Sequence, residues 1–256
     1  VAIPVIDTKH KAGRFPGAGS VREFWRNLAH GRSAVEWYSH VALAAAGESP
    51  TIIARPDYVA AGAPLTNIED FDPEFFGLSS LDASLLDPQH RLFLEVCWEA
   101  LEDGGYAGDR VPGPVGVFGG TGQQAYLTEH VLRNRELVET LGDFYLRHTG
   151  NDKDFLCSRV SFALNLTGPS LTVQTACSTS LVAVHLAAQS LLAGECALAL
   201  AGGVSILLPH RRGYRVREGG VVAQDGVCRA FSADGTGTVF GSGAGVVLLR
   251  RLADAV

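Results

Sequence analysis

Several short apolar runs in this chain are bounded by glycines or turn residues and alternate with segments of helical spacing. The clearest are "VGVFGG" at 115–120 and "ALALAGGVSIL" at 197–207. A strand that is apolar on both faces has to be covered on both faces, which is typical of a parallel sheet between layers of helices. We therefore expect an α/β layered fold with a largely parallel sheet.

The helical segments have apolar stripes and recognisable ends. In "LDPQHRLFLEVCWEALEDGGY" at 86–106, Leu92 and Val96 share one side, Pro88 suits the helix start and Gly104 its end. We find neither a repeat nor an internal linker and expect one structural unit. The other expected elements are helices at 22–31, within 123–140, over 152–164 and at 178–193, a strand at 170–176 and a glycine-rich strand pair at 237–252.

The charge balance excludes several classes of function. The chain has 21 basic and 27 acidic residues and no Lys/Arg stripe interleaved with aromatic residues, which argues against nucleic-acid binding. The one basic cluster, "HRRGYRVR" at 210–217, is expected to be a solvated surface, with docking of an acidic partner as the alternative. No apolar run reaches membrane-spanning length and the start, "VAIPVIDTKHKAG", shows no secretory pattern, so we expect a cytoplasmic protein without membrane contact.

Five cysteines offer candidate chemistry. None stands in a CxxC or Cys/His ligand spacing, so we expect neither a disulfide framework nor a metal site. Cys97 and Cys157 lie inside predicted helices and Cys196 begins a predicted strand, so we expect these three to be packed in the core. Cys228 is expected in a loop, where nothing nearby activates it.

Cys177 differs from the others because it lies at the turn between the predicted strand at 170–176 and the predicted helix at 178–193. That helix is apolar all round apart from His185, which predicts a buried central helix, and hydroxyls at 178–180 lie near its unpaired backbone N–H groups. A helix start stabilises a thiolate, and a backbone N–H there can help to bind an oxyanion. Cys177 is therefore a candidate nucleophile, with a structural cysteine as the alternative.

No histidine is well placed to take the thiol proton. His185 lies roughly 12 Å along the helix axis from Cys177 and is expected to be a core histidine. His90 is expected to cap or pack, and His148 and His210 to lie in loops. A cysteine hydrolase of the α/β class would need an acid and a histidine downstream, and no such pair is visible. "DGTGTVFGSGAG" lacks the spacing of a phosphate-binding loop, so we expect no nucleotide cofactor.

Eight motifs, spread over nearly the whole chain from residue 12 on, can be compared as an ordered set with known families. They are "AGRFPGA" (12–18), "FDPEFFG" (71–77), "LDPQHRLFLEVCWEALEDGGY" (86–106), "VGVFGG" (115–120), "GNDKDFLCSRVSFALNLTGPS" (150–170), "TVQTACSTSLVAVHLAAQSLLAGE" (172–195), "LAGGV" (200–204) and "DGVCRAFSADGTGTVFGSGAGVVLL" (225–249). In this order they resemble the β-ketoacyl synthase (ketosynthase) domain of modular type I polyketide synthases, in the thiolase-like superfamily.

The resemblance implies an acyltransferase chemistry. It implies that Cys177 accepts an acyl chain from an acyl carrier protein as a thioester. A malonyl-type extender is then decarboxylated, and the resulting carbanion attacks that thioester in polyketide chain elongation. The backbone N–H of Cys177 would form half of the oxyanion hole. No cofactor or metal is implied in this domain, because the substrates arrive on the phosphopantetheine of the carrier protein.

The resemblance also implies a fold and partners. The superfamily fold is a five-layered αβαβα arrangement of two similar halves, and residues 1–256 correspond to the N-terminal part of a ketosynthase domain. The family's two catalytic histidines, its lysine and the glycine-rich segment of the oxyanion hole lie in the second half. The implied partners are the acyl carrier protein, neighbouring polyketide synthase domains and a second copy, which would meet this one at about 170–174, with "NDKDF" near the interface.

Two alternatives to the elongating ketosynthase stay open. A non-elongating relative would transfer the acyl group through Cys177 without condensing it, and an inactive scaffold fragment would take no acyl group. Decarboxylating loading domains and chain-length factors lack the cysteine, so neither fits. The chain departs from the family at "DTKHK" (7–11), where the family has a strand and a Gly–Met step, and at Ala197, where an acidic residue is usual.

Overall fold

The chain folds as two compact units. The structure, a computed structural model, describes residues 6–255. The first five residues of "VAIPVIDTKHKAG", the start that shows no secretory pattern, therefore lie outside the described residues. One unit comprises Val1–Arg14, Asn67–Ser205 and Ala244–Val256, the other Phe15–Thr66 and Ile206–Gly243. The prediction of one structural unit is therefore wrong. The second unit joins two stretches far apart in the sequence, and such long-range association leaves no mark in a local pattern.

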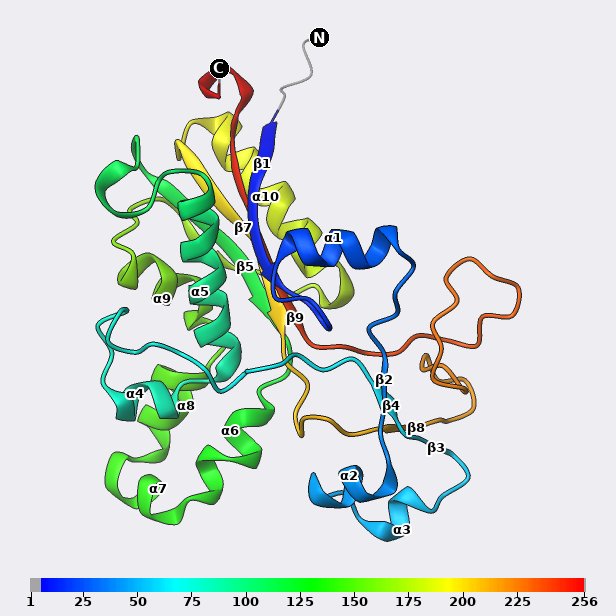
Figure 1. Cartoon of the computed structure of the whole chain (residues 1–256). Helices are drawn as coiled ribbons and strands as arrows, with labels where there is room; N and C mark the ends of the chain where they lie inside the picture. Colours follow the sequence, from blue (N-terminus) through cyan, green and yellow to red (C-terminus); the bar gives the residue numbers. More distant parts are fainter. Residues whose placement is uncertain (1–5, 256) are drawn as a thin grey trace. The chain divides into compact units, whose positions relative to one another are not determined.

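The first unit is built on a five-stranded sheet. Its strands are β1 (Ile6–Arg14), β5 (Val115–Thr121), β6 (Ser170–Thr172), β7 (Leu198–Ser205) and β9 (Gly243–Arg251). They lie in the order β1-β9-β7-β5-β6 (Figure 1). β5 pairs in parallel with both β6 and β7, whereas β1 and β9 pair antiparallel. The predicted parallel sheet is confirmed for β5, β6 and β7.

Helices cover both faces of this sheet, as the α/β prediction requires. The helices and 3-10 turns of the unit are α4 (Ser80–Leu85), α5 (Pro88–Asp103), η1 (Gly108–Arg110), α6 (Ala125–Glu129), η2 (Val131–Arg133), α7 (Arg135–Leu141), α8 (Asp143–Asn151), α9 (Phe155–Ala163), η3 (Ala176–Ser178), α10 (Thr179–Ala193) and η4 (Leu252–Asp254). α5 and α9 pack on one face and α10 on the other (Figure 1). Pro88 at the first position of α5 and Gly104 at its C-cap confirm the predicted ends of that helix.

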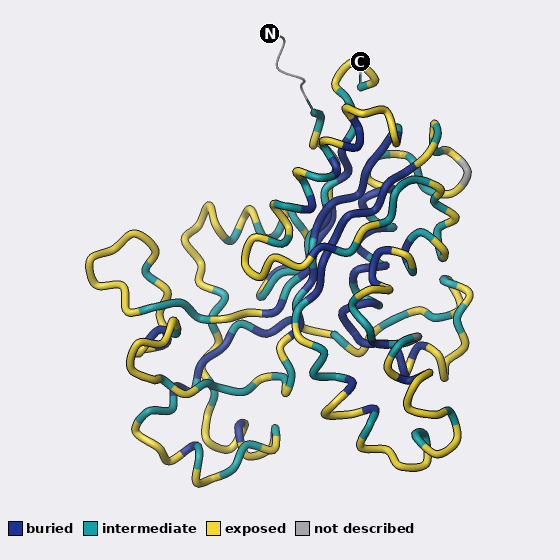
Figure 2. The backbone as a smooth tube through the Cα atoms, turned by 180° about the vertical axis from the view of Figure 1, so that it is seen from behind, coloured by how far each residue is buried: buried dark blue, intermediate teal, exposed yellow. Residues whose placement is uncertain are grey.

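The most buried part of this unit is its central strands (Figure 2). All seven residues of β5 are buried. Phe118 on β5 packs with Ala183, Ala187 and Leu191 of α10 and with Leu249 of β9. Because Ala183 and Ala187 are small, the first half of α10 can pack closely against the sheet.

α10 is buried on one face only, so the prediction of a helix buried all round is wrong. The face with Ala183 and Ala187 contacts the sheet, whereas Leu181 is 74% exposed and Leu192 is also exposed. The apolar pattern shows which surface needs covering, and it does not show what covers it.

α10 has 15 residues, and within residues 6–255 no helix is both long and apolar enough to cross a membrane.

The predicted strand pair at 237–252 is a single strand, β9, and its antiparallel partner is β1. The backbone before β9 bonds to other segments. Ser242 N donates to Ala63 O at 2.9 Å, and Ser242 Oγ accepts from Leu207 N at 3.0 Å. A hairpin prediction fails here because these partners are distant in the sequence.

Two further elements are shorter than predicted. The segment 123–140 forms α6, η2 and α7 instead of one helix, since its apolar residues Leu127 and Val131 turn toward Leu85 and Leu146 in a small buried cluster. The strand predicted at 170–176 pairs over three residues only, because the chain then turns toward α10.

The second unit contains short helices and two small sheets. Its elements are α1 (Val21–Ala29), β2 (Glu36–Trp37), α2 (His40–Ala45), α3 (Pro50–Ile53), β3 (Tyr58–Val59), β4 (Ala61–Gly62) and β8 (Tyr214–Arg215). β2 pairs with β4, and β3 pairs with β8, both antiparallel. α1 confirms the helix predicted at 22–31, and its Phe24 ring stacks on Phe15 at 4.2 Å.

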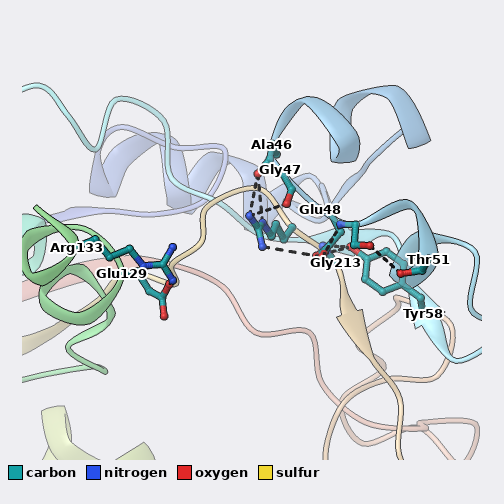
Figure 3. Close-up of polar contacts among 10 residues, drawn as sticks. Ala46, Gly47, Glu48, Thr51, Tyr58, Glu129, Arg133 and Gly213 are labelled. Carbon is teal, nitrogen blue, oxygen red and sulfur yellow. Dashed lines mark hydrogen bonds and ion pairs between the residues drawn. The ribbon is translucent and has the colours of Figure 1, made fainter.

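The basic cluster at 210–217 belongs to the packing of this unit. Arg212 donates to Ala46 O and Gly47 O, each at 3.1 Å. Figure 3 labels Ala46 and Gly47, and dashed lines mark the hydrogen bonds that they accept. Arg215 forms an ion pair with Asp57 at 2.6 Å. The prediction of a solvated surface is therefore confirmed for Arg215, which is exposed, and wrong for Arg212, which is half-buried and bonds to two backbone carbonyls.

Replacing Phe93 with alanine should strongly destabilise the first unit. Phe93 is fully buried on α5, and loss of such a ring costs about 3–5 kcal/mol. Phe144, which is 75% exposed, provides a matched control, and Phe144→Ala should cost less than about 0.5 kcal/mol. Denaturant unfolding measures both free energies. Equal losses in the two variants would contradict the described core.

Candidate active site

Cys177 lies where the parallel strands end. Val173 N donates to Gly119 O at 2.7 Å and closes the pairing of β6 with β5. Three residues later the 3-10 turn η3 begins at Ala176, and α10 follows it directly. Ligands of α/β proteins bind beyond the carboxyl ends of the strands, which is the edge where Cys177 lies. The strand–turn–helix placement predicted for Cys177 is confirmed, and its side chain is exposed.

The residue before Cys177 has a strained backbone. Ala176 adopts φ +53°, in the left-handed region that residues with a Cβ rarely occupy. Strain of this kind persists only where the surrounding structure holds it, and it is common at functional sites. A strained turn of this kind is similar to the nucleophile elbow of hydrolases, and the Cys177 side chain that follows it is exposed.

Hydroxyl groups hold this turn closed. Thr179 Oγ1 accepts from Thr175 N at 3.0 Å and donates to Ala176 O at 2.8 Å. Ser178 Oγ donates to Thr175 O at 2.9 Å, and Ser178, the N-cap residue of α10, makes no side-chain cap. The expectation that these hydroxyls accept hydrogen bonds from the first N–H groups of α10 is therefore wrong for Ser178 and Thr179. Both bond back into the turn instead.

The start of α10 gives the turn a favourable potential for an anion. A helix places about half a positive charge at its N-terminus. The first turn of α10 carries no acidic residue that would neutralise it. An oxyanion that forms beside Cys177 during a reaction is stabilised by such a potential.

The other four cysteines lack this setting. Cys97, Cys157 and Cys196 are buried, as predicted. Burial raises the pKa of the Cys97 thiol well above its usual value and that of Cys157 to about 12, so both stay protonated. Cys228 is exposed in a loop, with its Sγ 3.9 Å from Thr238 Oγ1. Among the cysteines, only Cys177 combines exposure with a helix start.

Three histidines considered as possible partners of Cys177 lie in different settings. His185 is exposed on α10, so the prediction of a core histidine is wrong. His148 lies in α8 and not in a loop, with its Nδ1 3.3 Å from an oxygen of Asp152. His210 does lie in a loop of the second unit, where its Nε2 is 2.8 Å from Leu65 O.

A buried polar network holds the loop after β5, and the sequence pattern did not identify it. Gln89 Nε2 donates to Gln123 O at 2.9 Å, and Gln89 Oε1 accepts from Gly122 N at 3.0 Å. Asp87 accepts from Gln89 N at 2.8 Å, and burial raises the pKa of the Asp87 carboxyl against this hydrogen bond. The sequence feature that could have indicated this network is "DPQHR" (87–91), a run of polar residues at the start of an apolar helix. The network fixes the same sheet edge at which Cys177 lies.

His90 is buried in this region, as the packing prediction requires. Neither of its ring nitrogens has a hydrogen-bond partner within the part of the chain that the structure describes. Burial, with a smaller effect of Arg159, lowers the pKa of His90 from 6.5 to about 3, so the ring is neutral. Residues 6–255 contain no group of three or more His, Cys, Asp or Glu side chains placed to hold a metal ion.

Comparison with known proteins gives a consistent result. The family model "Beta-ketoacyl synthase, N-terminal domain" matches residues 11–255. A phenolphthiocerol/phthiocerol polyketide synthase of Mycobacterium tuberculosis is 49% identical over 250 residues, which are 96% of this chain and 17% of that protein. Polyketide synthase PksL of Bacillus subtilis is 37% identical over 255 residues, 95% of this chain and 5% of that protein.

Solved structures agree with the sequence matches. Ketosynthase twelve from the bacillaene polyketide synthase in Bacillus amyloliquefaciens superposes with a TM-score of 0.89 at 34% identity, over 98% of this chain and 43% of that one. The fold is therefore thiolase-like, and the chain spans less than half of this solved ketosynthase and about a sixth of the mycobacterial synthase.

The buried His90 should make stability depend on pH. Between about 6.5 and about 3 the unfolded chain binds a proton at this ring and the folded chain does not, so the free energy of unfolding falls as the pH falls through this range. The slope from this group is at most about 1.4 kcal/mol per pH unit. His90→Gln should therefore flatten the curve of unfolding free energy against pH. Parallel curves for the wild type and His90→Gln would contradict the burial of a neutral ring.

Proposed function

Because the chain belongs to the β-ketoacyl synthase family, we propose that it forms the N-terminal part of a ketosynthase domain in which Cys177 is the nucleophile and the acyl anchor. One observation carries this proposal. Cys177 is an exposed thiol directly after a left-handed residue and directly before an uncapped helix start. The three buried cysteines and the loop cysteine Cys228 lack that combination.

The first step is acyl transfer. The Cys177 thiolate attacks the carbonyl carbon of an acyl thioester, the new S–C bond forms, and the bond to the sulfur of the carrier breaks. That sulfur leaves as a thiolate and takes up the proton that Cys177 has lost. The oxyanion of the tetrahedral intermediate lies at the positive end of α10, where the backbone N–H of Cys177 can donate to it.

The second step is condensation. A malonyl-type extender loses CO₂, and its carbanion attacks the acyl carbon on Cys177. A carbon–carbon bond forms, the S–C bond breaks and the Cys177 thiolate is restored. The family resemblance assigns the decarboxylation step to two histidines and a lysine in the second half of the fold, outside these 256 residues.

The proposal includes the carrier and the neighbouring domains. Substrates would arrive on the phosphopantetheine of an acyl carrier protein, so the domain needs no cofactor of its own. The similar proteins are polyketide synthases of which this chain matches 17% or less, which supports a role as one part of a multidomain synthase.

We also propose that two copies pair through β6. β6 is at the edge of the five-stranded sheet, and an exposed edge offers unpaired backbone groups to a second strand. Leu171 on β6 is 50% exposed, and Phe162 on the adjoining α9 is 90% exposed. Ser161 Oγ of α9 donates to Ser170 Oγ of β6 at 3.1 Å, so α9 adjoins this edge of the sheet.

Cys177→Ser should abolish condensation in the full-length protein. A serine hydroxyl is a far weaker nucleophile than a thiolate, and loss of a covalent nucleophile costs a factor of about 1000 or more. Cys228→Ser makes the same change at the other exposed cysteine and should keep the wild-type rate. The assay follows product formation from an acyl thioester and malonyl carrier protein by mass spectrometry. Condensation by Cys177→Ser at the wild-type rate would refute the proposal, and acylation without condensation in the wild type would indicate a non-elongating relative.

Leu171→Lys should weaken the dimer of the domain that contains this chain. A lysine at a buried edge-strand contact brings an unpaired charge into the interface, and the dissociation constant should rise about 100-fold. Leu81→Lys, at a leucine of nearly equal exposure on α4, is the control and should leave it unchanged. Sedimentation equilibrium measures both. The same dissociation constant in both variants would exclude β6 from the interface.

A further inference from the structure

Gly120 has no room for a side chain, and the two groups that fill its space belong to the turn that carries Cys177. A Cβ on Gly120 would lie 2.1 Å from Val173 O and 2.4 Å from Thr179 Cγ2. Val173 ends the pairing of β6 with β5, and Thr179 begins α10. β5 therefore touches the segment on both sides of Cys177.

Thr179 connects this contact to the strained residue. Its methyl group lies against Gly120, while its hydroxyl accepts from Thr175 N and donates to Ala176 O. Both hydrogen bonds hold the peptides around Ala176, whose φ of +53° gives the bend before Cys177. A displacement of Thr179 away from β5 would therefore move the carbonyl and the amide that shape the bend.

We propose that Gly120 is a positioning residue for Cys177, and that it acts through Thr179. The inference rests on the proposed role of Cys177 as nucleophile. Gly120 does not have a positive φ, so the need for glycine here is a need for space and not for a special backbone conformation. A methyl group at this position would force Thr179 to move by about 1 Å to reach ordinary contact, and a misplacement of this size can cost about 100-fold in rate.

The neighbouring residue provides a matched control. A Cβ on Gly119 would lie 2.4 Å from Phe93 Cζ, a collision as close as the one between Gly120 and Thr179. It would occur on the other face of the sheet, against the α5 side chain and away from the turn. Gly203 on β7 is a second control, because its Cβ would lie 3.4 Å from Gly120 O and 3.7 Å from Ser180 Cβ, which are ordinary van der Waals contacts.

The test compares Gly120→Ala, Gly119→Ala and Gly203→Ala in the full-length protein. Three quantities are measured: the melting temperature, the rate of acylation of Cys177 by a saturating acyl thioester, and the position of the Cys177 sulfur in crystals. Gly120→Ala should lower the acylation rate about 100-fold and shift the sulfur by about 1 Å. Gly119→Ala should also lower the melting temperature, with the acylation rate and the sulfur position close to the wild type. Gly203→Ala should match the wild type in all three.

Two results would overturn the inference. One is an unmoved sulfur in Gly120→Ala. The other is an equal loss of acylation in Gly120→Ala and Gly119→Ala, which would make Gly120 a stabilising residue only. Failure of the proposed function looks different, since the wild type itself would then take no acyl group at Cys177, while the crystal positions would still report on Gly120.

Thr179 keeps the inference testable if Gly120→Ala does not fold. Thr179→Val retains the methyl contact with Gly120 and removes both hydrogen bonds to the turn, so acylation should fall about tenfold. Thr179→Ser retains the hydroxyl and should restore most of that rate. Equal rates in Thr179→Val and the wild type would contradict the route through Thr179.

Discussion

The short parallel pairing of β6 with β5 is the constraint on which the position of Cys177 depends. It extends over Ser170–Thr172 and ends at the hydrogen bond from Val173 N to Gly119 O. The chain then has to reverse within a few residues to begin α10. It does so through the left-handed Ala176, which two hydroxyl bonds of Thr179 hold in place. The strand pairing, the strained residue and the two hydroxyl bonds together form the turn in which Cys177 is exposed.

The placement of Cys177 could be predicted because it depends on local pattern. A β-branched strand, a cysteine and a long apolar helix follow one another, and the structure has them in that order. The bend itself could not be predicted. A left-handed residue is usually indicated by glycine or asparagine, and Ala176 gives no such sign. The use of the Ser178 and Thr179 hydroxyls within the turn, and not as helix caps, depends on the same bend.

Long-range association limited the rest of the prediction. The strand at 115–120 and the helix from Pro88 were predicted well, since each buries its own apolar residues and has its own ends. The second unit and the β1–β9 pair were missed because their segments lie far apart in the sequence. Leu181 and His185 on the exposed face of α10 show the same limit, as an apolar stripe does not identify the surface that covers it.

Peptide mapping after incubation with an acyl thioester tests the account most directly, because the chain holds its own controls. Cys228 is exposed but lies in a loop, and Cys97, Cys157 and Cys196 are buried. The account predicts an acyl adduct on the peptide with Cys177 and none on the peptides with the other four. An adduct on Cys228 at a comparable rate, or an unmodified Cys177 in the folded full-length protein, would contradict it.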